Sequence, residues 1–179
     1  MALLAEEIVE EWLNRNGYFT IRGARVGVHE IDLLAVKLTQ NVPECRHIEV
    51  QASINPVSYI TAVSKKLQQE SGRKAASAKV RSDGELEEGI REWVEKKFDH
   101  KKKVELRSKL APGKWSRELV VHKVKHPREK ELLKRAGVKI HELSEILKEM
   151  NQGGTLLERA AGTSLVELAF VRWHQENPD

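Results

Sequence analysis

Residues 30–36 read Glu-Ile-Asp-Leu-Leu-Ala-Val, and residues 47–51 read His-Ile-Glu-Val-Gln. Both segments have the apolar content of buried β-strands, yet both carry acidic side chains. Aspartate and glutamate are depleted in strands and are costly to remove from water as ions. A buried strand that carries an acid therefore usually has a nearby cation, or a reaction that uses the acid. Two such strands in succession predict a metal site.

The spacing of the two acids, Asp32 and Glu49, favours a shared site. Side chains alternate across a strand, so each acid lies on the face opposite its apolar neighbours. Between the strands, residues 38–45 include Asn41 and Pro43, which favour a turn, so a hairpin is the simplest connection. In a hairpin the two carboxylates would converge. Carboxylate oxygens with open positions for water and phosphate are what Mg²⁺ prefers, and the spacing of His and Cys does not indicate zinc.

The order of these segments resembles that of the PD-(D/E)XK nucleases, the restriction-endonuclease-like superfamily. A helix with a glutamate comes first, then the EIDLLA stretch, then a strand with a hydrophobic residue before Glu-Val. The first helix is most similar to the Holliday-junction-resolvase-like branch, through Glu6, Val9, Trp12-Leu13 and Gly17-Tyr18. The resemblance covers roughly residues 3–80. It implies an α/β fold with a restriction-endonuclease-like mixed central sheet, flanked by helices.

The resemblance also implies a function and a set of site residues. Asp32 and Glu49 would bind one or two Mg²⁺ (or Mn²⁺) ions, with the Val50 carbonyl as a further ligand. The protein would hydrolyse DNA phosphodiester bonds. Helical periodicity places both Glu6 and Glu11 at the margins of the buried stripe of the first helix and does not choose between them. The family pattern selects Glu6, which would position a metal-bound water.

One position departs from the family pattern, because Gln51 stands where the family has its active-site lysine. Glutamine can donate a hydrogen bond to an attacked phosphate but brings no charge. We expect Lys66, or Lys65, to replace the lysine from a long helix predicted over residues 57–78. One alternative is a catalytically inactive DNA-binding or assembly module that keeps the fold. A weaker alternative is a structural metal site.

Charge is distributed unevenly along the chain. The formal net charge is +4, but residues 51–135 hold 22 Lys and Arg against 12 Asp and Glu. Such a basic region predicts a DNA-binding surface whose affinity falls as salt rises, although charged runs are also common on solvated faces. Within it, Trp115 lies in a basic loop predicted over residues 107–117. This Trp could stack on a base or pack on the protein's own core.

Length and composition fit one domain with a core, because the chain has 179 residues and is 40% hydrophobic. We assign residues 1–150 to the nuclease-like domain. Residues 151–179 would form a C-terminal helical extension, with a helix over 156–173 that packs on the domain or forms the surface of a homodimer. The sequence has no apolar run long enough for a membrane span and no signal-peptide pattern at its start, so no membrane partner and a cytoplasmic location are expected.

The remaining predicted elements alternate between strand and helix, which is typical of a mixed α/β sheet. A histidine, His47, shares its strand face with Glu49, and we favour a structural role for it over a catalytic one. Helices are predicted over 3–16, 85–99, 128–136 and 144–150. Further strands are predicted over 18–22, 103–106, 118–125 and 138–143.

Overall fold

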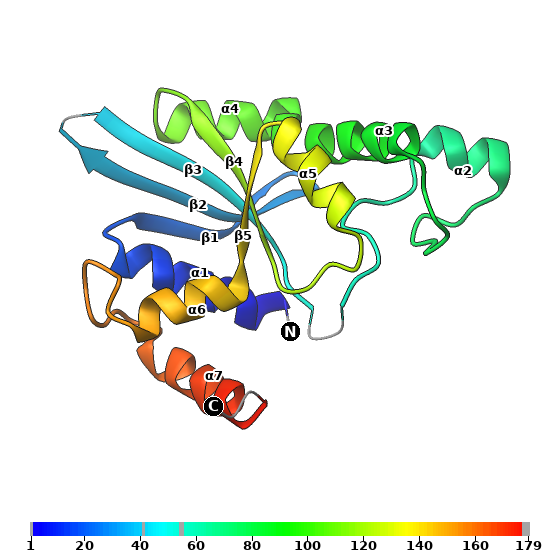
Figure 1. Ribbon diagram of the computed structural model, residues 1–179. Helices are drawn as coiled ribbons and strands as arrows, with labels where there is room; N and C mark the ends of the chain where they lie inside the picture. Colours follow the sequence, from blue (N-terminus) through cyan, green and yellow to red (C-terminus); the bar gives the residue numbers. More distant parts are fainter. Residues whose placement is uncertain (1, 41, 54–55, 177–179) are drawn as a thin grey trace.

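A computed structural model describes residues 2–40, 42–53 and 56–176 (Figure 1). It is a mixed α/β fold with a five-stranded sheet in the order β1-β2-β3-β4-β5. The strands are β1 (Phe19–Val26), β2 (His29–Thr39), β3 (Val42–Gln51), β4 (Trp115–Val121) and β5 (Val138–Glu142). The helices are α1 (Ala2–Arg15), α2 (Lys65–Ser71), α3 (Asp83–Val94), the π-helical turn η1 (Glu95–Asp99), α4 (Lys101–Leu110), α5 (Pro127–Arg135), α6 (Leu143–Asn151) and α7 (Thr163–Glu176). The predicted fold class, a mixed sheet flanked by helices with a C-terminal helix, is confirmed.

The sheet combines two kinds of pairing. Strands β1, β2 and β3 form an antiparallel meander, and β4 and β5 continue the sheet in parallel with β3. The predicted hairpin between the two acidic strands is confirmed. Its strands are longer than expected, because Thr39 pairs with Val42 and the connection is only two residues long. The predicted turn former Asn41 lies outside the described residues.

Helices cover both faces of the sheet (Figure 1). On one face, α1, α6 and α7 pack on a core that includes Leu13 and Leu33. On the other face, α3, η1 and α5 pack on a second core that includes Phe98 and Leu119. Burial of these apolar side chains is the main stabilising contribution to such a layered fold. Within the described residues, no helix is both long and apolar enough to cross a bilayer.

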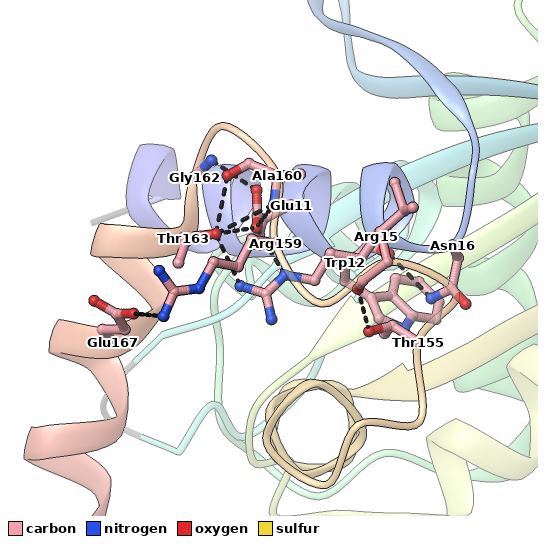
Figure 2. Close-up of polar contacts among 11 residues, drawn as sticks. Glu11, Trp12, Arg15, Asn16, Thr155, Arg159, Ala160, Gly162, Thr163 and Glu167 are labelled. Atoms are coloured by element: carbon pink, nitrogen blue, oxygen red, sulfur yellow. Dashed lines mark hydrogen bonds and ion pairs between the residues drawn. The ribbon is translucent and has the colours of Figure 1, made fainter.

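The C-terminal helix begins later than predicted, and the segment before it contacts α1 (Figure 2). The centre of this contact is Glu11, which is only 1% exposed. Its carboxylate accepts hydrogen bonds from the backbone N–H groups of Ala160 (2.9 Å) and Gly162 (2.6 Å), and it pairs with Arg15 Nε at 2.7 Å. Of the two glutamates that periodicity left open, Glu11 therefore binds the C-terminal segment to α1.

The predicted long helix over residues 57–78 is wrong. Only α2 is helical there, and residues 56–64 run in an irregular, partly extended path. Tertiary contacts fix this path, because the buried carboxylate of Glu129 on α5 accepts hydrogen bonds from the backbone N–H groups of Ile60 (2.6 Å) and Thr61 (2.9 Å). The β-branched residues of this stretch also favour extended backbone. Ser64 then caps α2 by accepting a hydrogen bond from the third helical residue.

The predicted strand over residues 103–106 is also wrong, because these residues lie within α4. The buried residues of α4 are Lys103 and Arg107, four positions apart on one helical face. This face is cationic, so the apolar periodicity that marks an amphipathic helix is missing from the sequence. The predicted helix over 85–99 is present, but its last turn is the π-helical η1. The other predicted strands, and the other predicted helices that pack on the sheet, are present with shifted ends.

Candidate functional site

Asp32 and Glu49 come together where β2 and β3 part. Backbone pairing between the two strands extends to Leu33 opposite Ile48. Beyond this point the N–H group of Val50 donates a hydrogen bond to Oδ2 of Asp32, at 2.8 Å. This hydrogen bond places the Asp32 carboxylate beside Glu49, as the alternation of the two strands predicted.

Negative charge accumulates at this position. Burial, and then the charge of Glu49, raise the pKa of Asp32 from its ordinary value of 3.8 to about 6. Glu6 extends from α1 toward the same region: burial raises its pKa, and the charges of Glu30 and Glu49 add to this effect. The structure thus gathers the three acids that the sequence singled out, and Asp32 carries the strongest resulting penalty on its charge.

The acids do not by themselves form a closed metal cage. Among the described residues, no group of three or more His, Cys, Asp or Glu side chains is arranged to hold a metal ion. Two carboxylates and the Val50 carbonyl, the ligand set expected from the sequence, leave several positions to water or substrate. Hard oxygen donors with open positions suit Mg²⁺ or Mn²⁺.

A lysine from η1 contacts this pair of acids. Lys97 Nζ lies 2.5 Å from Oε2 of Glu49, and Asp32 adds to its electrostatic environment. Burial would lower the pKa of Lys97, but the charge and the hydrogen bond of Glu49 outweigh burial and raise it. The Lys97 ammonium group therefore stays charged beside the two carboxylates. Single π-helical turns occur frequently at functional sites.

A second lysine contacts Glu49 from α4. Lys103 Nζ lies 3.2 Å from Oε1 of Glu49 and also donates a hydrogen bond to the carbonyl of Lys97, at 2.9 Å. Because burial is the largest effect on Lys103, its pKa is lowered despite the attraction of Glu49. Lys103 thus ties α4 to both the sheet and η1.

His47 connects Glu49 to Arg107. Arg107 donates from its guanidinium to Nδ1 of His47, at 2.5 Å, and His47 Nε2 lies 3.0 Å from Oε1 of Glu49. Since a guanidinium can only donate, Nδ1 must be the acceptor and Nε2 must carry the proton. His47 is therefore a neutral imidazole that donates to Glu49.

The protonation states of His47 and Glu49 follow from this chain of contacts. Burial and the nearby charges of Arg107 and Lys103 lower the pKa of His47 from 6.5 to about 4. For Glu49, burial alone would raise the pKa, but the hydrogen bond from His47 and the charges of Lys97 and Lys103 outweigh it and lower the pKa from 4.5 to about 2. At neutral pH, Glu49 is ionised.

Gln51, which stands at the position of the family lysine, and the lysines expected to act in its place have other surroundings. The amide of Gln51 donates a hydrogen bond to the carbonyl of Ile60, at 2.9 Å, and so binds the irregular segment after β3. Lys66 is exposed on α2, as is Lys65. Their predicted role stays a prediction, while Lys97 is a lysine that contacts Glu49 directly.

Lys97, Lys103 and Arg107 were missed as site residues because the sequence gives little warning of buried cations. A signal does exist for Lys97. The apolar stripe of α3 includes Ile90 and Val94, and Lys97 follows them at helical spacing. A charged residue on such a stripe indicates either the end of burial or an oppositely charged partner. For Lys103 and Arg107, the spacing of four is the only mark.

Comparisons of the chain with known protein families and structures add little to this description of the fold. No family model matches the chain, and no curated protein matches it. The chain is similar to the crystal structure of a protein of unknown function, AF1548, with 14% identity and a TM-score of 0.45. The match covers 80% of this chain, which spans 59% of the length of that protein.

Proposed function

We propose that this protein is a divalent-metal-dependent nuclease-like protein that hydrolyses DNA phosphodiester bonds. The observation that carries the proposal is the position of Asp32 beside Glu49, at the point where two paired strands part, with Lys97 in contact. The resemblance of the sequence to the PD-(D/E)XK nucleases supports the same assignment.

The chemistry of the donor set fits a divalent cation. The raised pKa of Asp32 means that its negative charge is destabilised by burial and by Glu49. A cation bound by Asp32, Glu49 and the Val50 carbonyl would remove this penalty. When bound, such a metal supplies Lewis acidity toward the phosphate and lowers the pKa of a bound water.

The residues of the chain would divide the remaining tasks. Glu6, half-buried and with a raised pKa, is suited to accept a proton from an attacking water or to orient it. Lys97 carries the positive charge that Gln51 lacks and would stabilise negative charge on the attacked phosphate. His47 would keep the Glu49 carboxylate oriented through its Nε2 hydrogen bond. In this proposal Lys97, rather than Lys66, takes the place of the family lysine.

Basic side chains near the site would bind the DNA backbone. Lys96 and Lys102 are exposed. The pKa of His29, at the start of β2, is lowered first by burial and then by the charges of His100, Lys102, Lys103 and Lys96. Both lysines therefore lie near the start of β2, as Lys103 does. Lysines in such positions would contribute a salt-dependent, sequence-independent affinity.

One observation favours the inactive DNA-binding module as a second candidate. Both oxygens of Glu49 already accept hydrogen bonds from lysines, Oε2 from Lys97 and Oε1 from Lys103. Such a carboxylate is largely neutralised without a metal. A protein that had lost its metal would be stabilised by this arrangement.

The test is cleavage of supercoiled, branched and single-stranded DNA with Mg²⁺ or Mn²⁺. We expect Asp32→Ala to abolish cleavage while leaving salt-dependent DNA binding within about threefold, because the phosphate contacts come from lysines. Glu30→Gln, on the same strand, is the matched control and should cleave normally. Unchanged cleavage by Asp32→Ala would refute the assignment. Absence of cleavage by the wild-type protein, with DNA binding intact, would favour the inactive module, and Gln51→Lys would then test for a gain of activity.

A further inference from the structure

A cavity of about 610 Å³ lies on the α4 side of the sheet, and neither Asp32 nor Glu49 lines it. It is bounded by α4, by the loop that leads into β4, and by the first residues of β4 and β5. This volume falls in the range of small-molecule sites, roughly 300–1,000 Å³. Its most informative lining residues are Asp99, Arg107, Lys114, Trp115, Arg117 and Lys139.

The lining is strongly cationic. The lining holds one acid, Asp99, whose carboxylate lies 2.8 Å from Nη2 of Arg117. It also holds four cationic side chains, those of Arg107, Lys114, Arg117 and Lys139. The positive charges therefore exceed the negative charge several times over. An anion would be attracted to this cavity, and a cation repelled.

Arg107 is a largely buried cation in the lining of the cavity. Its side chain is 7% exposed, and its Nε has no hydrogen-bond partner among the described residues, although the atom is buried. The same guanidinium donates to His47 at its other end. Leaving a buried, charged donor unpaired costs more than leaving a neutral one, so an anion held close to this guanidinium would stabilise it.

An aromatic side chain is the second feature of the lining. Trp115 donates a hydrogen bond from its indole Nε1 to the carbonyl of Ala111, at 3.2 Å, which fixes the orientation of the ring. Nucleobases stack on aromatic rings with a favourable free energy of about 1–3 kcal/mol per base. A fixed Trp beside a cluster of cations suits a ligand that has both a base and a phosphate.

We propose that this cavity binds a free nucleoside monophosphate, with its phosphate against Arg107 and Arg117 and its base against Trp115. Lys114 and Lys139 would add charge at the entrance, where both are exposed. The site is separate from the acids, but Arg107 joins it to Glu49 through His47. Binding does not depend on nuclease activity, so this proposal and the proposed function can fail independently.

The first test is calorimetric titration of the wild-type protein, without divalent metal, with AMP, ribose 5-phosphate, inorganic phosphate and adenosine. We expect AMP to bind at least tenfold more tightly than inorganic phosphate, and adenosine to bind weakly. Lys114→Ala and Lys139→Ala should each weaken AMP binding roughly fivefold, which corresponds to about 1 kcal/mol. Lys109→Ala removes an exposed lysine of α4 outside the lining and should leave the affinity unchanged.

A second measurement addresses Arg107 without mutating it, because a variant at this buried position could fail to fold. In ¹⁵N-resolved spectra of the wild-type protein, AMP should shift the Nε–H resonance of Arg107 and the Nδ1 resonance of His47. Equal affinities for AMP and inorganic phosphate would overturn the mononucleotide assignment. AMP binding that leaves the Arg107 resonance unmoved, or that Lys109→Ala weakens as much as Lys139→Ala does, would overturn the site.

Discussion

Lys97 and Glu49 form an ion pair of 2.5 Å between residues that lie 48 positions apart in the sequence. The pair joins a π-helical turn on one side of the sheet to the end of a central strand. It puts a permanent positive charge next to the two carboxylates on which the proposed chemistry depends. Lys97 is thus the residue whose replacement tests the site most directly.

We expect Lys97→Gln to reduce metal-dependent DNA cleavage by at least 100-fold, because a preorganised charge at the attacked phosphate is lost. DNA binding should change by less than about threefold, since one phosphate contact at most is removed. Carbon-13 NMR of the glutamate carboxylates should also show the pKa of Glu49 rising, as its closest cation is gone. Lys109→Gln, an exposed lysine of α4 outside the proposed site, is the control.

Two results would contradict this role for Lys97. One is a cleavage rate that Lys97→Gln leaves unchanged. The other is an equally large loss in Lys66→Gln, which would return the family lysine's task to α2 as the sequence predicted.

Asp32 and His47 affect stability in opposite directions as pH changes. The pKa of Asp32 is raised from 3.8 to about 6, so its contribution to stability is fully present below pH 3.8 and is lost as pH rises through about 6. The pKa of His47 is lowered from 6.5 to about 4, so its contribution is present above pH 6.5 and is lost as pH falls through about 4. Over this shared range, the two effects largely cancel in the wild-type protein.

Asp32→Asn should separate the two effects. At pH 7 without divalent metal, we expect the variant to be more stable than wild type by roughly 2–3 kcal/mol, because a destabilised charge is removed while an oxygen remains to accept from Val50. On acidification from pH 6.5 to 4, the variant should lose stability more steeply than wild type, since the His47 effect is no longer opposed. Urea unfolding at several pH values measures both. A variant less stable than wild type at pH 7, or one with a parallel pH profile, would contradict the account.

The contact between Glu11 and the C-terminal segment can be tested through stability. Glu11→Gln replaces a buried carboxylate that pairs with Arg15 and accepts from Ala160 and Gly162. We expect a loss of about 2–4 kcal/mol in the free energy of unfolding, because Arg15 stays buried without its partner. Hydrogen exchange at the amides of Ala160 and Gly162 should become faster.

Glu7→Gln provides the control for this prediction. Glu7 lies on the same helix and pairs with Arg22 at 3.1 Å, but both side chains are about one-third exposed. Its replacement should cost less than about 1 kcal/mol, as for exposed ion pairs. Equal losses in the two variants would argue that Glu11 has no special part in binding the C-terminal segment.

The sequence predicted those features of the fold and site that follow from local pattern. Asp32 and Glu49 were placed together because strand alternation and a short connection leave few other arrangements. The helix expected over 57–78 failed for a nonlocal reason, since Glu129, about 70 positions further on, fixes the backbone at Ile60 and Thr61. Propensity within the segment carries no information about that partner.

The cations around Glu49 were out of reach for a related reason. Burial is predicted from apolar residues, and Lys103 and Arg107 are buried by attraction to Glu49 and His47 instead. Their helix has no apolar face to reveal it. The basic residues near position 100 were interpreted as a surface for DNA, while some of them point inward to the acids.

The π-helical turn η1 makes the spacing of the chain as important here as its chemistry. Removing Glu95 or Lys96, the two residues of the turn that precede Lys97, would move Lys97 back by one position and rotate it by about 100° about the helix axis, away from Glu49. The lysine would still be present, but it would face elsewhere. Among relatives of this protein, a single-residue insertion or deletion before this lysine would therefore separate proteins that keep a lysine beside the acids from those that do not. The site would differ even where every side chain is retained.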